Sequence, residues 1–90
     1  MFTVFGFYKF QKINDLKKNQ KILSNLLTNK NINGSIIISK EGLNGSISGM
    51  KKDIKTTIIR LKKILNIKEF DSVNNSISKF KPFHKPKVKI

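Results

Sequence analysis

The sequence has 90 residues, of which 38% are hydrophobic and 27% charged, a length that suits one small domain with a single core. It has no cysteine and one histidine, which excludes disulfides, thiolate metal sites and cysteine nucleophiles and leaves no metal cluster. Lysine and arginine total 19 against 5 acids, so the formal net charge is +14 and a polyanionic partner is favoured.

The basic charge has a second interpretation. Lysine, asparagine and isoleucine are abundant and Arg60 is the only arginine, as codon bias in an AT-rich genome would produce. Such a bias explains lysine over arginine but not the scarcity of acids. No apolar run approaches the roughly 20 residues of a membrane span, and Met1 leads into Phe2 without a basic segment. We therefore expect a cytoplasmic protein that has no membrane partner.

The first expected element is a strand over residues 2–10, which is apolar on both alternating faces. One face carries Phe2, Val4, Tyr8 and Phe10, and the other carries Thr3, Phe5 and Phe7. This pattern is typical of a central strand. We expect the aromatic rings to pack in the core, with base stacking on an open sheet face as the alternative.

A helix is expected next, capped by Asn14, with Asp15 in its first turn and its end near Lys30. Its apolar stripe consists of Leu16, Leu23, Leu26 and Leu27. Residues 35–39 and 46–48 are typical of two neighbouring strands, joined through a loop over residues 40–45.

A second helix shows the cleanest periodicity in the chain. Its apolar positions, spaced at i, i+4, i+7 and i+11, are Ile54, Ile58, Leu61 and Leu65. Extended character resumes through Val73 and Ile77, and Pro82 and Pro86 then interrupt regular pairing before residues 87–90 alternate again.

This order predicts an α+β fold of the ferredoxin-like, acylphosphatase-like βαββαβ type. The expected architecture is a four-stranded antiparallel sheet with both helices on one face, plus a C-terminal extended tail. The domain is expected to span residues 1–81.

No catalytic constellation can be assembled from the residues present. The five acids are dispersed, and no nucleophile, base and orienting group occur together. Acylphosphatases, which share the expected fold, bind phosphate with an arginine and a backbone cradle after the first strand. Here residues 11–14 contain neither arginine nor glycine, and Arg60 lies in the second helix. We therefore expect a non-catalytic domain without a cofactor or metal.

Two segments carry a family resemblance. Residues 41–45, Glu-Gly-Leu-Asn-Gly, together with Gly49, resemble a stretch near the N-terminus of the bacterial tRNA uridine hydroxylases, which are rhodanese-related proteins. Residues 82–90, Pro-Phe-His-Lys-Pro-Lys-Val-Lys-Ile, are similar to the segment that leads into the rhodanese domain of that family. Met50, residues 74–76 and Pro86 depart from the family pattern.

The resemblance implies a ferredoxin-like domain followed by a rhodanese domain, whose cysteine supports oxygen-dependent hydroxylation of the wobble uridine to 5-hydroxyuridine. Residues 82–90 would then begin a linker strand toward that domain. The resemblance also implies two partners, which are the anticodon region of tRNA and the rhodanese domain of the same parent chain.

The candidate site residues fall into two groups. The candidates for RNA binding are Lys40, Asn44, Lys79, Lys81, Lys85 and Lys87. The candidates for an interdomain contact are Glu41, Leu43, Phe83 and His84. Turn chemistry alone also explains the glycines of residues 40–45, and a solvated edge strand also explains the alternating tail lysines.

Two functions remain open at this point. In the first, exposed lysines hold the tRNA backbone so that a separate rhodanese domain reaches the anticodon uridine. In the second, the chain is a structural module that packs on the rhodanese domain without RNA contact, which requires an apolar patch near Leu43 or Phe83. The isolated domain is expected to be monomeric.

Overall fold

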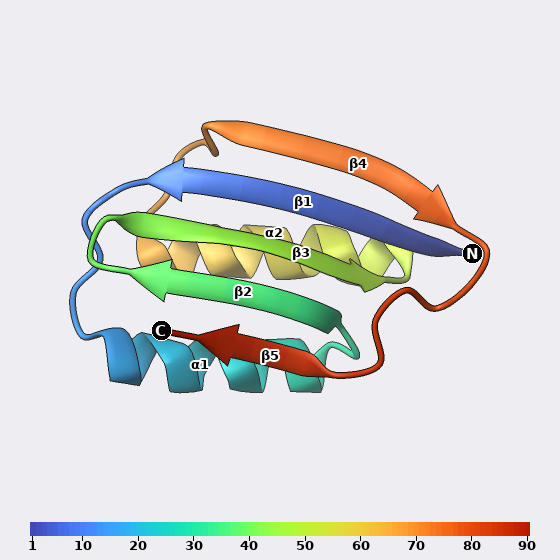
Figure 1. Cartoon of the computed structure of the whole chain (residues 1–90), viewed down its shortest axis with the longest axis horizontal. Coiled ribbons are helices and arrows are strands. Elements are labelled where there is room, and N and C mark those ends of the chain that lie inside the picture. Colours follow the sequence, from blue (N-terminus) through green and yellow to red (C-terminus); the bar gives the residue numbers. More distant parts are fainter.

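A computed structural model describes residues 1–90 as one α/β unit with five strands and two helices (Figure 1). The elements are β1 (Phe2–Phe10), α1 (Leu16–Asn29), β2 (Asn33–Ser39), β3 (Gly42–Gly49), α2 (Lys51–Leu65), β4 (Ser72–Ser78) and β5 (Pro86–Lys89). Neither helix has the length and apolar character needed to cross a bilayer.

The sheet has five strands in the order β4-β1-β3-β2-β5, so the expected count of four was wrong (Figure 1). The first four strands pair antiparallel in the ferredoxin-like order, and β5 pairs parallel with β2. The tail joins the sheet because Val88 is buried against the core. The Gly34 N–H donates to the Lys85 carbonyl at 2.9 Å, and Gln20 Nε2 donates to the Val88 carbonyl at 2.8 Å.

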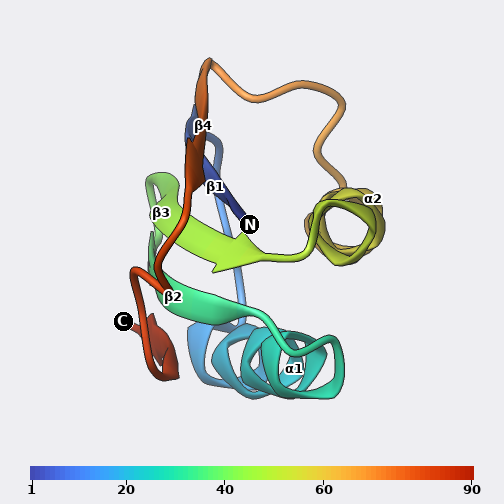
Figure 2. The same ribbon diagram turned by 90° about the vertical axis from the view of Figure 1, so that its right-hand side faces the viewer.

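Both helices lie on one face of the sheet, as Figure 2 shows in side view. The core between the layers is formed by apolar side chains from every element except β4. Its most deeply buried members are Leu23, Leu27, Ile32, Ile36, Ile38, Ile47 and Leu61. In α2 the predicted stripe is confirmed, with Ile54, Leu61 and Leu65 buried and Ile58 half-buried.

The first helix begins differently from the expectation. It starts at Leu16, after Asp15 in the left-handed region with φ 49°, and no side chain caps its N-terminus. Asn14 therefore does not act as the cap. Its carbonyl instead accepts a hydrogen bond from Asn19 Nδ2 at 2.8 Å. The β1–α1 connection is thus fixed by contacts other than the predicted cap.

The connection between β2 and β3 is a tight turn at Lys40 and Glu41, shorter than the expected loop. Gly42 already belongs to β3 and has φ 150°, and a Cβ there would collide with the Lys9 carbonyl oxygen. Asn44 and Gly45 were expected in that loop, but neither has a positive φ and both pair regularly within the sheet. Leu43, also expected in that loop, lies in β3 and is only 4% exposed.

Candidate nucleic-acid interface

The face of the sheet opposite the helices is open and carries small polar side chains among a few apolar ones. Paired residues in a sheet present their side chains to the same face, so the register assigns its members. From β4 they are Ser72, Asn74, Ser76 and Ser78, from β1 Phe2, Val4, Gly6, Tyr8 and Phe10, from β3 Asn44, Ser46 and Ser48, from β2 Asn33, Ser35, Ile37 and Ser39, and from β5 Lys87 and Lys89. Ser48 differs from the others in being buried, with only 1% of its surface exposed.

Three aromatic residues of β1 lie on this open face, and of these Phe2 is half-buried. Tyr8 is 41% exposed and Phe10 is 72% exposed, and their rings meet edge to face with centroids 5.5 Å apart. The expectation of core packing was confirmed for Phe5 and Phe7 and wrong for Tyr8 and Phe10. The difference follows from strand alternation, because the helices cover one face only.

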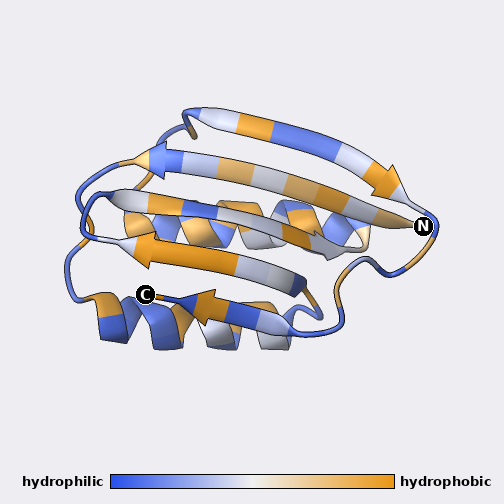
Figure 3. Ribbon diagram, in the orientation of Figure 1, coloured by the Kyte–Doolittle hydropathy of each residue, from blue (hydrophilic) through white to orange (hydrophobic).

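One row of residues crosses the sheet at Tyr8, toward the end where β1 finishes. In register with it are Ser72 on β4 and Asn44 on β3, while Ile37 on β2 pairs with Asn44 and Lys89 on β5. Ile37 is 43% exposed, although its neighbours along the strand are fully buried. Figure 3 shows the hydrophobic part of β2, to which all three isoleucines belong, in orange. The row therefore places an aromatic ring, an amide, an apolar side chain and a lysine together on one surface.

The next row is hollowed at its centre, because it contains Gly6. The hollow has a volume of about 410 Å³. It is lined by Gly6, Phe7, Tyr8, Ser35, Asn44, Gly45, Ser46, Ser72 and Asn74. Apart from the ring of Tyr8, the side chains that reach it from the open face are hydroxyls and amides, which can donate and accept hydrogen bonds.

Of the predicted RNA-binding residues, the structure brings Asn44 and Lys87 onto the open face. Lys87 pairs with Ser35 in the hollow's row. Lys85 is exposed just before β5, and Lys79 and Lys81 are exposed in the β4–β5 connection. Lys40 lies in the β2–β3 turn, at the other end of the sheet from that connection (Figure 1). The predicted lysines therefore do not form one cluster.

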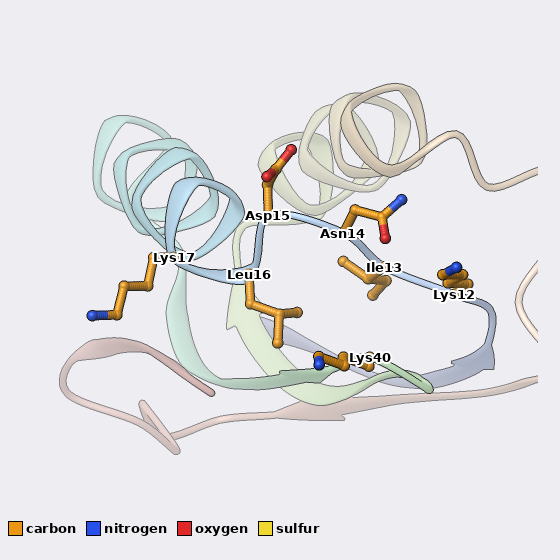
Figure 4. A pocket seen from close by; sticks show the side chains of 7 residues that line it. All are labelled: Lys12, Ile13, Asn14, Asp15, Leu16, Lys17 and Lys40. Carbon is orange, nitrogen blue, oxygen red and sulfur yellow. The ribbon is translucent and has the colours of Figure 1, made fainter.

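Lys40 instead lines a separate hollow of about 730 Å³ beside the start of α1. In Figure 4 the amino groups of Lys12 and Lys17 diverge on either side of it. The Gln11 N–H donates to the Glu41 carbonyl at 3.0 Å, and the Ile13 N–H donates to the Lys40 carbonyl at 3.3 Å. These amide groups are thus occupied by backbone oxygens and do not form a phosphate cradle after β1.

The predicted interdomain residues are also dispersed. Leu43 is buried beneath the sheet, whereas Glu41 is exposed in the β2–β3 turn. Phe83 is half-buried and His84 exposed in the β4–β5 connection, close in sequence to the highly exposed Phe80. Leu43 therefore cannot contribute an apolar patch, while the region of Phe83 retains one.

A second uncovered surface lies between α2 and β4. Val73 and Ile77 face the helix side of the sheet but remain exposed, because α2 packs over β1 and β3. The hollow beside them measures about 560 Å³. Its lining residues are Thr3, Phe5, Lys51, Ile54, Lys55, Ile58, Asn75, Ser76 and Ile77. Four of the nine lining residues of this α2–β4 groove are apolar.

Asp71 fixes the end of β1 that carries Phe10. Its Oδ2 accepts a hydrogen bond from the Phe10 N–H at 2.7 Å, and its Oδ1 lies 3.5 Å from Lys9 Nζ. The hydrogen bond from Phe10 and the positive charge of Lys9 hold the pKa of the Asp71 carboxyl below its usual value. The carboxylate therefore remains ionised while it holds this strand end.

Several open-face residues were missed by the sequence predictions, above all Gly6 and Asn74. The sequence does contain one signal for this face, which is the alternation of polar residues along the last antiparallel strand. Residues 72, 74, 76 and 78 are all serine or asparagine, as expected for an exposed strand face next to the even-numbered residues of β1. Without the register, however, nothing in the sequence places Gly6 between Asn74 and Ser46.

The chain matches the family described as the UPF0176 acylphosphatase like domain over residues 2–90. All of its 90 residues align at 62% identity with the tRNA uridine(34) hydroxylase of Pelagibacter ubique (strain HTCC1062), of whose length the chain spans 30%.

Among solved structures, the acylphosphatase from Coxiella burnetii matches with a TM-score of 0.70 at 11% identity, covering 98% of this chain and 93% of that one. The acylphosphatase from Bacillus subtilis matches with a TM-score of 0.67 at 6% identity, covering 100% and 99%. These likenesses confirm the acylphosphatase-like ferredoxin fold.

Proposed function

The chain belongs to the family of UPF0176 acylphosphatase like domains, and from this premise we propose that it is the tRNA-facing domain of a tRNA uridine hydroxylase. It corresponds to the N-terminal, non-catalytic part of such an enzyme. The domain holds tRNA near the anticodon, and a rhodanese domain elsewhere in the parent chain carries out the hydroxylation.

The distribution of charge on the open face is the observation that carries this proposal. Lys87 and Lys89 extend from β5 on this face, and Lys85 lies next to them. No strand contains an acidic residue, because the five acids lie in α2 and in the connections. Phosphate groups that follow the β5 edge would therefore meet positive charge without a competing carboxylate on the strands.

A structural module that packs on the rhodanese domain is the second candidate function. The α2–β4 groove favours it, since Ile77, which lines the groove, is 72% exposed and leaves apolar surface uncovered there. The groove and the open face lie on opposite sides of the sheet. The two functions therefore use different surfaces and can be tested separately.

Salt-dependent titration of an anticodon stem-loop tests the proposal. Each phosphate that a lysine neutralises releases counterions, so log affinity falls with log salt at about −0.7 per contact for single-stranded RNA. We expect a Kd of about 10⁻⁴ to 10⁻⁶ M near physiological salt, the range of non-specific binding. Changing both Lys85 and Lys87 to Gln should reduce the slope by about 1.4.

The matched control changes Lys52 and Lys63 to Gln, which removes the same charge from the exposed side of α2. Its slope should stay at the wild-type value, with melting curves showing that both variants fold. Equal slopes for the two double variants would remove β5 from the RNA surface. No binding of the wild type even at low salt would instead favour the structural module.

A further inference from the structure

Gly6 is an unusual glycine for a central strand. At Gly34, Gly42 and Gly45 an added Cβ would come closer than 3.0 Å to a backbone atom of a neighbouring strand, so close packing requires glycine there. At Gly6 the nearest atoms, the Cβ and carbonyl oxygen of Asn74, lie 3.8 Å away, which is ordinary contact. Its φ also lies outside the left-handed region. Neither backbone conformation nor packing therefore demands glycine at this position.

A glycine inside a strand destabilises the fold, since it loses more conformational entropy on folding than any other residue. Such a residue often marks a place where a ligand approaches the backbone closely. At Gly6 the missing side chain leaves the hollow of about 410 Å³ at the centre of the open face. The hollow therefore exists because position 6 is a glycine and has no side chain to fill it.

The groups around the hollow suit a nucleobase. The exposed ring of Tyr8 forms one side, supported by the edge contact with Phe10, and aromatic rings of this kind stack on unpaired bases. Asn44 and Asn74 flank the hollow with side-chain amides, each of which offers a donor and an acceptor to a base edge.

These polar groups are also free to bind a ligand. The side-chain hydrogen bonds within the protein involve other residues, so the side chains of Asn44, Asn74 and Ser46 make none. Lys87, which pairs with Ser35 in the same row, lies where the phosphate of a bound nucleotide would leave the hollow toward β5.

We propose that the hollow over Gly6 binds one unpaired nucleobase of single-stranded RNA, with Tyr8 stacking on the base and Asn44 and Asn74 contacting its edge. This inference rests on the RNA-holding function proposed above and adds a base-binding subsite to its lysine contacts. It assigns the open face to RNA and leaves the α2–β4 groove for protein.

Two substitutions remove the subsite in different ways. Gly6→Val fills the hollow, and since β-branched residues favour strands and the Cβ has room, the variant should melt at or above the wild-type temperature. Gly6→Ala, which is smaller, provides a graded second variant. Tyr8→Ala removes the stacking ring, and Ile59→Ala, on the exposed side of α2, is the control for loss of exposed apolar surface.

The probes are a single-stranded uridine pentamer and an abasic ribose-phosphate strand of the same length, titrated at low salt. Wild type should bind the pentamer more tightly than the abasic strand. Tyr8→Ala should weaken pentamer binding about 5- to 150-fold, the range of base–aromatic stacking. Gly6→Val should abolish the preference for the pentamer, Gly6→Ala should reduce it, and Ile59→Ala should leave it unchanged. The slope of affinity against salt should stay constant in all four variants.

The outcomes separate this subsite from the wider function. If Gly6→Val and Tyr8→Ala keep the wild-type preference while the Lys85 and Lys87 double variant loses slope, the base subsite is wrong and backbone holding stands. If both variants weaken the abasic strand as much as the pentamer, they act on the phosphate surface, and the subsite is equally overturned. A wild type that binds neither strand would overturn both proposals.

Discussion

Ile36, Ile37 and Ile38 are consecutive residues of β2, but they differ in burial because they face opposite sides of the sheet. The outer two are fully buried beneath the helices, whereas Ile37 is 43% exposed on the open face. On the covered face large apolar side chains fill the space between sheet and helices. On the open face the side chains around Tyr8 are small, because the neighbouring positions are glycine, serine and asparagine. Alternate residues of the same strands thus serve stability on one face and are available for binding on the other.

The largest expected effect is a difference in stability between substitutions at Ile38, on the covered face, and Ile37, on the open face. Ile38→Ala should lower the free energy of unfolding by about 2–5 kcal/mol, because it leaves a cavity in a fully buried site. Ile37→Ala, one residue away, removes the same atoms from a half-open surface and should cost far less. Urea unfolding of the two variants measures the difference directly.

The pair also tests the assignment of the two faces. Similar losses for both variants would show that the open face is covered in solution, for instance by a second copy of the chain. Sedimentation at the concentrations used for unfolding provides the control, since covering by self-association would make the loss at Ile37 depend on concentration.

A smaller effect concerns the rim of the open face at Phe10. The hydrogen bond from the Phe10 N–H, and then the charge of Lys9, hold the Asp71 pKa in the folded protein below its usual value. Stability from this carboxylate is therefore fully present above about pH 4 and is lost as pH falls through the lowered pKa. Asp71→Asn should be slightly less stable than wild type at neutral pH.

The difference between Asp71→Asn and wild type should shrink as the pH is lowered from 5 toward 2. Thermal melts across that range measure it, and Glu69→Gln, at an exposed acid without an ion pair, is the control. A difference that stays constant with pH would show that Asp71 holds Phe10 without its charge.

Much of the fold was accessible from the sequence because burial imposes periodicity. The spacing of Ile54, Leu61 and Leu65 predicts α2, and the strand order follows from the ferredoxin-like pattern. The fifth strand was missed because Pro82 and Pro86 favour an irregular tail. Val88 joins the core only once α1 and β2 are in place, and a local pattern does not contain that contact.

The candidate site was harder to predict from the sequence, since it depends on how the strands are aligned with one another. Residues 40–45 were predicted as a loop from their glycines, but Gly42 is required by the close approach of the Lys9 carbonyl and Asn44 lies within β3. The tail lysines were identified by alternation, and Lys87 does lie on the open face. The hollow over Gly6 requires four strands to be aligned side by side, and spacing along the sequence does not determine that alignment.

The most direct test of the central claim, that RNA binds the open face, is an NMR titration of the isotope-labelled domain with an anticodon stem-loop at low salt. We expect chemical-shift changes concentrated at Gly6, Tyr8, Asn44, Asn74 and Lys87, with little change along the exposed side of α2. Shifts confined to the α2–β4 groove around Ile54 and Ile77, or to the hollow beside Lys12 and Lys17, would contradict it.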